Sequence, residues 1–322
     1  MRHAFFFFSL IFVLSLNASE MLERTQVMMG TFATVSLPQE ESEALQKSFT
    51  VLKAVEKSLS SYDPEADIYR LNHERKAVLS GYTYEALQRS KRYYDESDGY
   101  FDITVGSITK ELYRFGEEER VPRQRELEKA KVGFQGLHFN TEEAYLEKGV
   151  MVDLGGMGKG FGVDKAAAYL HEQKITEGKI ALSGDIRCLG VCEMAIQDPF
   201  GEGTVAAFKT KYPDMAISTS GNYRRYVGDK TANHLIDPKA KRPQQAFASI
   251  TLISRGANSD IDAYATAASV MPYEKAVPFL QQRGVGYILI TTGGERIVSE
   301  KIEYYVTDLI FVEMPKVQCE KE

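Results

Sequence analysis

A cluster of glycines that follows a short apolar run most constrains how this chain can fold. Residues 150–164 have the sequence VMVDLGGMGKGFGVD, with five glycines between Asp153 and Asp164. Apolar residues then continue at the spacing of a helix face, so the pattern predicts a strand, a glycine turn and a helix. Glycines let backbone N–H groups approach a ligand closely, and the N-terminal end of a helix favours an anion. The stretch is therefore a candidate phosphate site, although a tight structural turn would also explain its glycines.

Neither of the two familiar phosphate-binding motifs fits this stretch. A P-loop that ends at Lys159 requires a glycine where Asp153 stands and a serine or threonine where Gly160 stands. In the dinucleotide-binding fingerprint, the third glycine would fall at Phe161. The sequence thus excludes both common loops and leaves phosphate binding by another loop open.

Composition bounds the size of the protein and the class of its partners. The 322 residues, 43% hydrophobic and 26% charged, suffice for one large globular domain or two modest ones. The formal net charge is −6 and no basic tract offsets it, which argues against a nucleic-acid partner. Cys188, Cys192 and Cys319 form neither a disulfide framework nor a metal-binding spacing. Cys188 and Cys192 could pair only through a turn, and we do not expect that pair.

The N-terminus has the pattern of a secretory signal. Arg2 and His3 precede an apolar run over residues 4–16, and Asn17-Ala18-Ser19 follows. An apolar run of this length is short for a bilayer span, so residues 1–19 are predicted to be a cleaved signal peptide and residues 20–322 the mature protein. No cysteine lies near the cleavage point to accept a lipid. The alternative is an uncleaved membrane anchor.

The rest of the chain alternates strand-like and helix-like segments. Residues 25–37 are predicted to form one strand, and apolar residues at helical spacing predict a helix over 45–59 that ends before Pro64. Further helices are expected at 84–95, 161–173, 261–270 and 273–283, and strands at 179–183, 192–197, 204–209, 215–219, 247–253 and 285–291. Strands that outnumber helices favour an α+β fold, with mixed or antiparallel sheets and packed helices, over regular βαβ alternation.

A second candidate site lies at residues 258–268, NSDIDAYATAA. In a helix that begins near Ser259, the serine hydroxyl can cap while Asp262 sits three residues on, as in a capping box. Asp262 and Thr266 are four residues apart and share a helix face. Their carboxylate and hydroxyl oxygens suit a hard cation such as Mg²⁺, which completes its shell with phosphate and water. Taken alone, the stretch is better explained as a helix cap.

Nine short motifs, which include both candidate sites, follow one another between residues 29 and 290. They are MGT at 29–31, SYDP at 61–64, DGYFDITVG at 98–106, DLGGMGKG at 153–160, SGDI at 183–186, IQDP at 196–199, STSGNYRR at 218–225, HLIDP at 234–238 and DAYATA at 262–267. In this order they resemble the FAD:protein FMN transferase family, also called ApbE. Each motif alone is weak, and the specificity of the resemblance lies in the nine together.

The resemblance implies one transferase domain over residues 20–322, with an ApbE-like (T-fold-like) architecture. It implies an enzyme that uses Mg²⁺ to split its substrate FAD at the pyrophosphate and attaches FMN to a threonine of an acceptor protein through a phosphoester bond. The implied acceptor belongs to an exported or membrane redox complex. The implied location is periplasmic, with association with the inner membrane left open.

The resemblance also implies roles for individual residues. The catalytic positions are His234 and Asp262. The FAD-contacting positions are Met29, Tyr62, Tyr100, Phe101, Asp102, Asp153, Lys159 and Ile236. The implied metal ligands are the side chains of Asp262 and Thr266 and the backbone carbonyls of Gly156 and Ala265. A helical carbonyl already bonds within the helix, so the last of these would require the segment to begin irregularly.

Four residues depart from the family's usual pattern. The family usually has Ala at Gly158, Tyr at Phe161, Gly at Ser183 and Leu at Tyr264. The first two changes should alter turn flexibility more than chemistry, and the bulkier Tyr264 is expected to reshape the pocket edge. A lipoprotein cysteine, frequent in the family, is absent here.

The expected reaction is attack by the threonine hydroxyl on the FMN-side phosphorus, with AMP leaving. A cation and Lys159 would stabilise the developing charge. His234 is the natural base, with Asp237 and Asp262 as alternatives, and Tyr62, Tyr100 and Phe101 would offer ring faces to the isoalloxazine. This reading requires the loop after Leu154 and the segment from Asp262 to converge on one cavity.

Two other functions remain open from the sequence. A metal-dependent FAD pyrophosphatase would use water in place of the threonine, and a non-catalytic protein would only bind or deliver the flavin. Mn²⁺ or Ca²⁺ would suit the same oxygen ligands as Mg²⁺.

Overall fold

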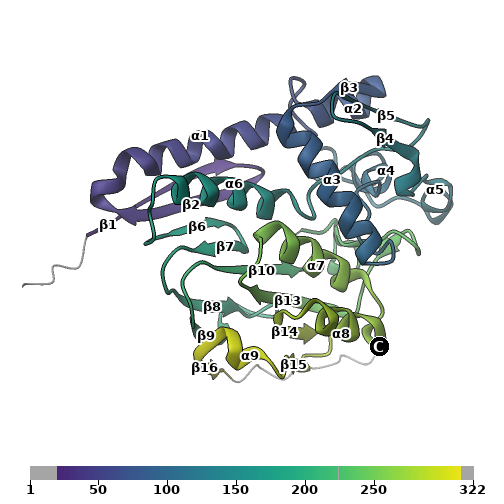
Figure 1. Ribbon diagram of the computed structural model, residues 1–322. Helices are drawn as coiled ribbons and strands as arrows, with labels where there is room; N and C mark the ends of the chain where they lie inside the picture. The colour runs from purple at the N-terminus through teal and green to yellow at the C-terminus, as the bar shows by residue number, and fades with distance from the viewer. Residues whose placement is uncertain (1–19, 224, 313–322) are drawn as a thin grey trace, which may run out of the picture.

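The computed structural model describes residues 20–223 and 225–312, and its main element is an antiparallel sheet of eight strands (Figure 1). In sheet order the strands are β1 (Met21–Met28), β2 (Thr31–Pro38), β6 (Lys179–Leu182), β7 (Asp185–Cys188), β10 (Met215–Gly221), β13 (Phe247–Ser254), β14 (Gly286–Thr291) and β15 (Arg296–Val298). All pairings within this sheet are antiparallel. The α+β class expected from the sequence is confirmed.

Helices cover one face of the large sheet, and a second sheet covers part of the other face. The helices are α1 (Ser42–Leu59), α6 (Gly158–Glu172), α7 (Asn258–Val270) and α8 (Tyr273–Arg283). The second sheet has the order β16 (Val306–Phe311), β9 (Thr204–Thr210) and β8 (Glu193–Gln197), with α9 (Ile302–Tyr305) beside it. Along β10, Ala216 joins the apolar cluster under the helices, whereas Met215 and Ile217 join the cluster between the two sheets.

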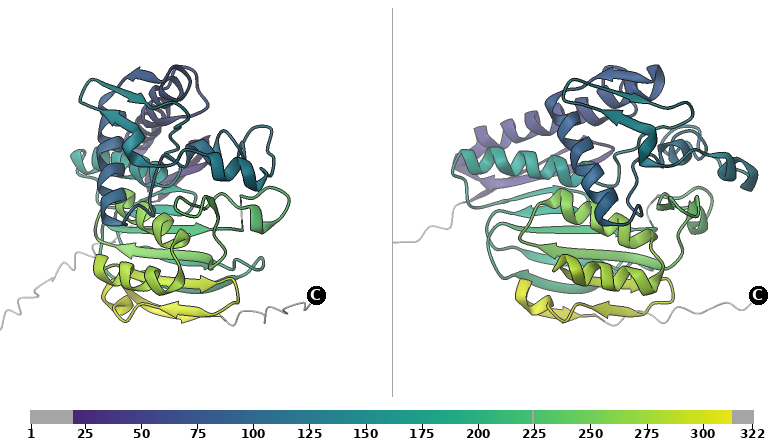
Figure 2. Two further views of the ribbon diagram at one scale, coloured as in Figure 1. Left: turned by 90° about the vertical axis from the view of Figure 1, so that its right-hand side faces the viewer. Right: turned by 45° about the vertical axis from the view of Figure 1, so that its right-hand side comes forward.

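A helical region with a third small sheet caps one end of the large sheet (Figure 2). It contains α2 (Asp67–Glu74), β3 (Lys76–Val78), α3 (Gly81–Glu96), α4 (Gly106–Thr109), α5 (Gln124–Lys129), β4 (Leu137–Phe139) and β5 (Glu143–Leu146). The loop between β10 and β13 adds a short ribbon of β11 (Ile236–Asp237) and β12 (Arg242–Pro243). The site lies where this region meets α6, α7 and the sheet.

Most expected elements are present, and the helices predicted at 161–173 and 261–270 each begin three residues earlier than expected. The single strand expected over residues 25–37 is wrong, because the chain reverses at Met29 and Gly30 to form the hairpin of β1 and β2. Met29 has φ 51° and Gly30 has φ 70°, as a two-residue hairpin turn requires. Methionine rarely adopts positive φ, so of the two turn residues only Gly30 indicated a turn in the sequence.

The low expectation for a Cys188–Cys192 pair is also wrong. The two cysteines form a disulfide with their Cα atoms 5.9 Å apart. Cys188 ends β7 and Cys192 precedes β8, so residues 189–191 supply the turn that the pair needs. Cys319 lies outside the described residues.

The predicted signal at residues 1–19 likewise lies outside the described residues. Within 20–223 and 225–312, no helix has both the length and the apolar character needed to cross a bilayer.

Candidate active site

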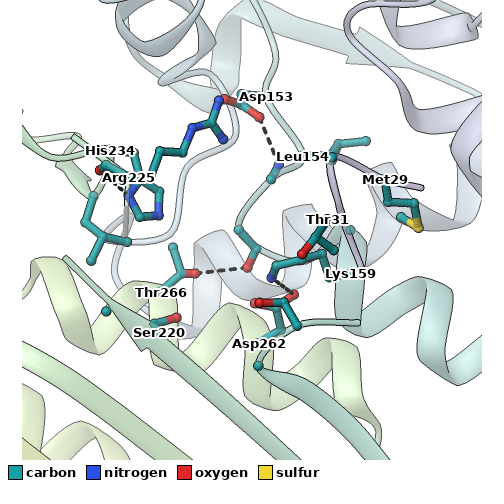
Figure 3. Close-up of a pocket in the computed structure, with 18 of the residues that line it drawn as sticks. Met29, Thr31, Asp153, Leu154, Lys159, Ser220, Arg225, His234, Asp262 and Thr266 are labelled. Atoms are coloured by element: carbon teal, nitrogen blue, oxygen red, sulfur yellow. Dashed lines mark hydrogen bonds and ion pairs between the residues drawn. The ribbon is translucent and has the colours of Figure 1, made fainter. Parts of the chain in front are cut away.

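A cavity of about 1100 Å³ opens between the glycine turn, α7, the end of the large sheet and the loop around His234 (Figure 3). Its volume is slightly above the usual range for small-molecule sites. The predicted site residues that line it are Met29, Tyr62, Tyr100, Phe101, Asp102, Asp153, Gly156, Lys159, His234, Ile236, Asp262 and Thr266. Of the predicted set, only Ala265 does not line it.

The glycine turn and α7 touch each other directly, which confirms the expected convergence. The Gly160 amide donates to Asp262 Oδ2 at 3.0 Å, and Thr266 Oγ1 donates to the Gly156 carbonyl at 3.1 Å. A Cβ on Gly160 would lie 2.6 Å from the carbonyl oxygen of Asn258, so only glycine allows this approach. The glycines therefore serve close helix packing as well as any ligand.

The stretch before the glycine turn is not the strand that we expected. Met151 forms only an isolated bridge with Val105, and Val152 has no neighbouring strand in the described residues. The Asn72 side chain satisfies the Val152 backbone instead: its amide donates to the Val152 carbonyl at 2.9 Å and accepts from the Val152 N–H at 2.8 Å. One buried side chain thus replaces a strand partner.

Lys159 lies between two buried carboxylates. Its ammonium is 2.6 Å from Asp185 Oδ2 and 3.5 Å from Asp262 Oδ2, and Ser218 donates to Asp185 at 2.6 Å. Burial, and then the neighbouring Asp185, raise the pKa of Asp262, although Lys159 opposes both. Burial would lower the pKa of Lys159, but the two carboxylates raise it, so the lysine is charged. Asp185 was not among the predicted site residues, although its place in the SGDI motif was a signal that could have found it.

Asp153 is a carboxylate held in its ionised form. Burial alone would raise its pKa, but the Lys110 ammonium and a hydrogen bond from Thr109 lower the pKa to about 2. Thr109 Oγ1 donates at 2.7 Å and the Gly155 N–H at 2.9 Å. This carboxylate therefore accepts hydrogen bonds rather than donating them.

The three aromatic residues expected to face a flavin differ in exposure. Tyr62 is 44% exposed at the rim, whereas Tyr100 is 7% and Phe101 is 2% exposed. The Tyr62 hydroxyl donates to the Phe115 carbonyl at 2.7 Å and accepts from Lys110 at 2.6 Å. Tyr62 is therefore the most exposed of the three, and the Lys110 ammonium lies over its ring, 4.0 Å from the ring centroid.

Asp102 has a local structural partner in addition to lining the cavity. Its Oδ1 accepts from the Thr104 backbone N–H at 2.8 Å and from the Thr104 hydroxyl at 2.7 Å. Burial raises the pKa of Asp102, while these two bonds lower it. The carboxylate holds the turn over residues 102–104, which directly follows Tyr100 and Phe101.

His234 faces the cavity from the loop that carries Arg225 (Figure 3). Its Nδ1 is 3.1 Å from the Arg225 carbonyl, which can only accept, so Nδ1 carries the proton and Nε2 is the free base. Burial, reinforced by the Arg225 charge, lowers the pKa of His234 to about 4. The imidazole is therefore neutral near pH 7.

The two alternative bases, Asp237 and Asp262, already accept hydrogen bonds from other groups. Asp237 Oδ1 accepts from the backbone N–H groups of Lys239 at 2.8 Å and Ala240 at 3.2 Å, and Asp237 does not line the cavity. Its carboxylate closes the turn before β12. Asp262 is already bound to Gly160 and Lys159.

Three oxygens at the junction of the glycine turn and α7 fit a hard cation. They are the Asp262 carboxylate, the Thr266 hydroxyl and the Gly156 carbonyl. Mg²⁺ binds through few protein oxygens and keeps water or phosphate in its remaining positions, so no larger group of acidic residues is needed. The described residues contain no cluster of three or more His, Cys, Asp or Glu side chains suited to a metal. The Ala265 carbonyl lies within the continuous helix α7 and stays a prediction.

The expected capping box at the start of α7 is wrong. The helix begins at Asn258, with Ala257 in the N-cap position. The Ser259 hydroxyl donates to Asp164 at 2.6 Å, and the Asp262 carboxylate turns to Gly160. Asp262 is therefore free of the cap and faces the cavity.

The expected effect of Tyr264 on the pocket edge is also wrong. The Tyr264 hydroxyl donates to Glu96 at 2.7 Å, and its ring packs edge-on against Tyr93 and Phe279. The side chain does not line the cavity. It fills the space between α3 and α8 instead.

An antiparallel α+β fold that places a glycine turn, two buried carboxylates and three aromatic side chains around one cavity is suited to an aromatic ligand that carries phosphate. The chain belongs to the ApbE family, whose model matches residues 29–289. Two curated relatives are FAD:protein FMN transferases. The protein of Escherichia coli (strain K12) is 28% identical, with 87% of this chain and 86% of that one covered, and the protein of Haemophilus influenzae is 30% identical, with 81% and 80% covered.

Solved structures agree with the fold. The crystal structure of the ApbE protein of Thermotoga maritima superposes with a TM-score of 0.82 at 23% identity, covering 90% of this chain and all of that one. The flavin transferase ApbE of Vibrio cholerae superposes with a TM-score of 0.78 at 25% identity, covering 89% of this chain and all of that one. The ApbE-like architecture implied by the nine motifs is thus confirmed.

Proposed function

We propose that this protein is an FAD:protein FMN transferase that requires Mg²⁺ and modifies a threonine of an exported or membrane redox protein. The convergence of Lys159 and the Gly156 carbonyl with Asp262 and Thr266 carries the proposal. Membership of the family and the names of its curated relatives support the flavin-transfer activity. The oxygen set supports the metal, and the apolar run at residues 4–16 supports export to the periplasm.

Different residues around the cavity are proposed to act in different parts of the reaction. Asp262, Thr266 and the Gly156 carbonyl would hold Mg²⁺, which supplies positive charge to the pyrophosphate oxygens when it is bound. Lys159 adds a fixed charge beside them and is itself held by Asp185. Because these groups are already in place before substrate arrives, little reorganisation opposes the reaction.

The proposed proton acceptor is Nε2 of His234. It takes the proton of the acceptor threonine as the threonine oxygen bonds to the FMN-side phosphorus. The bond from that phosphorus to the bridging oxygen breaks, and AMP leaves with the electron pair. A neutral imidazole with its other nitrogen fixed by the Arg225 carbonyl is suited to this role.

The mass of an acceptor protein tests the proposal. The purified protein is incubated with FAD, Mg²⁺ and an acceptor that bears the target threonine, with a Thr→Val acceptor as the matched control. Attachment of FMN to the threonine acceptor alone supports transfer. Free FMN and AMP with an unmodified acceptor would show a pyrophosphatase, and intact FAD that stays bound would show a binding protein.

A further inference from the structure

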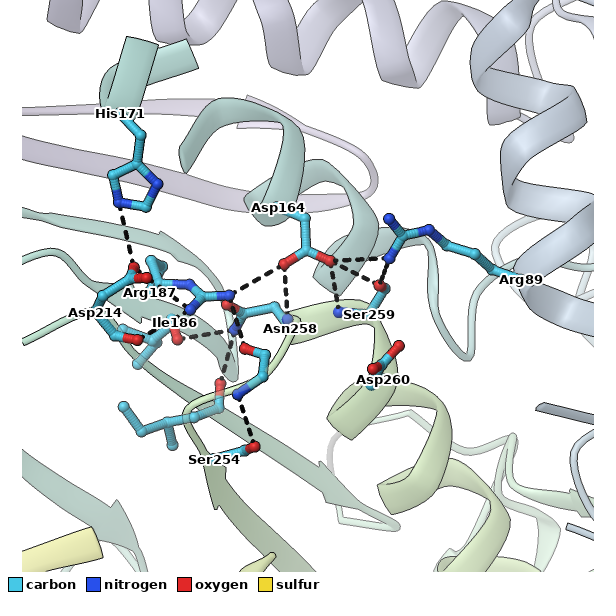
Figure 4. Close-up of polar contacts among 12 residues, drawn as sticks. Arg89, Asp164, His171, Ile186, Arg187, Asp214, Ser254, Asn258, Ser259 and Asp260 are labelled. Carbon is cyan, nitrogen blue, oxygen red and sulfur yellow. Dashed lines mark hydrogen bonds and ion pairs between the residues drawn. The ribbon is translucent and has the colours of Figure 1, made fainter. Parts of the chain in front are cut away.

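A second polar cluster lies beside the site at the N-terminal end of α7, and we call it the α7 anchor (Figure 4). It consists of Asp164 on α6, Arg187 on β7, Arg89 on α3, and Asn258 and Ser259 at the start of α7. Arg187 is 6% exposed, and Asn258 and Ser259 are fully buried. None of the five lines the cavity, so the anchor lies outside the cavity lining.

Asp164 caps α7 from a different helix. Its Oδ1 accepts from the Asn258 N–H at 2.7 Å, and its Oδ2 accepts from the Ser259 N–H at 3.0 Å and the Ser259 hydroxyl at 2.6 Å. The N-cap residue of α7 is Ala257, whose side chain cannot accept a hydrogen bond. Asp164 therefore satisfies orphan N–H groups of the first turn and places a negative charge at the positive end of the helix.

The remaining anchor residues tie the same point to two more elements. Arg187 donates to the Gly256 carbonyl at 2.9 Å, and its guanidinium is 3.3 Å from Asp164 Oδ1. The Asn258 side-chain amide donates to the Ile186 carbonyl at 2.8 Å, and Arg89 donates to the Ser259 hydroxyl at 2.8 Å. The start of α7 is thus bonded to α6, β7 and α3.

Three of these elements each carry one charged site residue close to their anchor residue. On α6, Lys159 precedes Asp164 by little more than one helical turn, and on β7, Asp185 and Arg187 lie on the same face of the strand. On α7, Asp262 follows Ser259 by three residues. Helices and strands are stiff over such short distances. The position of the anchor residues therefore fixes the positions of Lys159, Asp185 and Asp262.

We propose that Asp164 is a positioning residue for the cation site. It holds the start of α7 against α6 and β7, and so keeps Asp262 and Thr266 beside the glycine turn, where their oxygens and the Gly156 carbonyl would hold the cation. Asp164 itself touches neither cation nor substrate. The inference rests on the proposed function, because the cation site is part of that proposal.

Mn²⁺ binding to the purified protein, followed by electron paramagnetic resonance without FAD, tests this role. In Asp164→Asn the side chain keeps its size but loses its charge and one acceptor oxygen. Loss of a residue that orients metal ligands typically costs about 10- to 100-fold in metal affinity, and we expect the Mn²⁺ Kd to rise by that factor. The Tm should also fall, because a helix cap is lost.

Asp67→Asn is the matched control. Asp67 is 7% exposed and also links the start of another helix, since its Oδ2 accepts from the Ser80 N–H and the Thr83 hydroxyl, each at 2.7 Å. It lies outside the cavity lining. This variant should lower the Tm with an unchanged Mn²⁺ Kd. A residue that only stabilises the fold would behave in the same way, so Asp164→Asn with a lower Tm and an unchanged Kd would overturn the inference.

Two further outcomes also decide the question. If Asp164→Asn does not fold, Ser259→Ala removes one hydroxyl from the anchor and should raise the Kd about two- to tenfold, the worth of one hydrogen bond. An unchanged Kd in that variant would overturn the inference. If the wild-type protein binds no Mn²⁺, both the inference and the proposed cation dependence are wrong. If the wild-type protein binds Mn²⁺ and Asp164→Asn binds it with the same Kd, only the inference is wrong and the proposed function stands.

Discussion

The chemistry of single residues here depends on which buried charges they face. Asp262 is 2% exposed and shares the Lys159 ammonium with Asp185, which is fully buried. A carboxylate in such a place holds a proton more tightly than one in water, unless a cation takes the place of the proton. Burial favours the neutral form of His234 as well, and together with the nearby Arg225 charge it lowers the pKa of the imidazole.

Asp262→Ala should abolish Mg²⁺-dependent FMN transfer, because it removes the only carboxylate in the proposed ligand set. The matched control is Asp260→Ala on the same helix. Asp260 contacts Arg92 and accepts from the Tyr93 hydroxyl at 2.7 Å, outside the cavity lining. Initial rates measured over a range of Mg²⁺ concentrations check the prediction. Undiminished turnover in Asp262→Ala would refute the ligand assignment.

Cation affinity should weaken as the pH falls. The raised pKa of Asp262 means that the folded protein keeps a proton on this carboxylate at pH values where an exposed aspartate has lost it. The proton and the cation compete, so below the raised pKa the Mn²⁺ Kd should increase by about tenfold per pH unit. Titrations at pH 5.5, 6.5 and 7.5 measure this change. A constant Kd over that range would contradict the raised pKa.

His234→Ala should lower the transfer rate by about 10²- to 10⁴-fold while FAD affinity changes much less. The reason is that the imidazole is proposed to act on the acceptor hydroxyl rather than to bind the flavin. Single-turnover rates and FAD titrations separate the two quantities. Equal losses in rate and in FAD affinity would count against His234 as the base.

The pKa of His234 is about 4, so protonation of this imidazole should not slow the reaction between pH 8 and pH 6 at saturating Mg²⁺.

At the scale of elements, the site depends on how closely α6 and α7 approach. The contact is made by the backbone of Gly160 against Asn258 and Asp262, and the α7 anchor fixes the same pair of helices nearby. No such requirement applies at Gly158, where an added Cβ would meet no atom closer than 4.0 Å. Of these two glycines of the turn, only Gly160 is therefore required by the close packing of α7.

Gly160→Ala should destabilise the protein by about 1–3 kcal/mol and weaken Mn²⁺ binding, because its Cβ would push α7 away from the glycine turn. Gly158→Ala is the matched control, and it should leave stability unchanged or raise it slightly, since alanine favours a helix. Thermal unfolding and Mn²⁺ titration of both variants check this pair. Equal behaviour of the two alanines would show that the close approach is not needed.

At the scale of the whole molecule, the cavity lies where separate parts of the chain come together. The hairpin turn at Met29, the loop after α1 with Tyr62, the loop after α3 with Tyr100, the glycine turn and the His234 loop all border it. The N-terminal residues 1–19 precede this assembly and are proposed to direct export.

Expression of the full chain in a bacterium with a periplasm should place the protein in the periplasmic fraction, with its N-terminus near Ser19 or Glu20. Removal of residues 2–19 should retain it in the cytoplasm, because the apolar run is proposed to be the export signal. Fractionation and intact mass measure both outcomes. A full-length mass in the membrane fraction would indicate an uncleaved anchor instead.

Local patterns explain which features could be predicted. Residue patterns located α1, α8 and the strands β6, β8, β9, β10, β13 and β14, because periodicity is a property of neighbouring residues, whereas β7, β15 and β16 were not predicted. Motif order indicated the family and the residues that line the cavity. The reversal at Met29 was missed, because a methionine in the left-handed region is held there by tertiary structure.

The sequence by itself determined the α+β class, the family and the chemical types gathered at the site, since each follows from the identity and spacing of residues. The tertiary structure alone decided that Asp185 holds Lys159, that Asp164 caps α7 and that Cys188 meets Cys192. No spacing encodes these pairings. They depend on the packing of whole elements, which brings together groups whose separation along the chain says nothing of their distance in space.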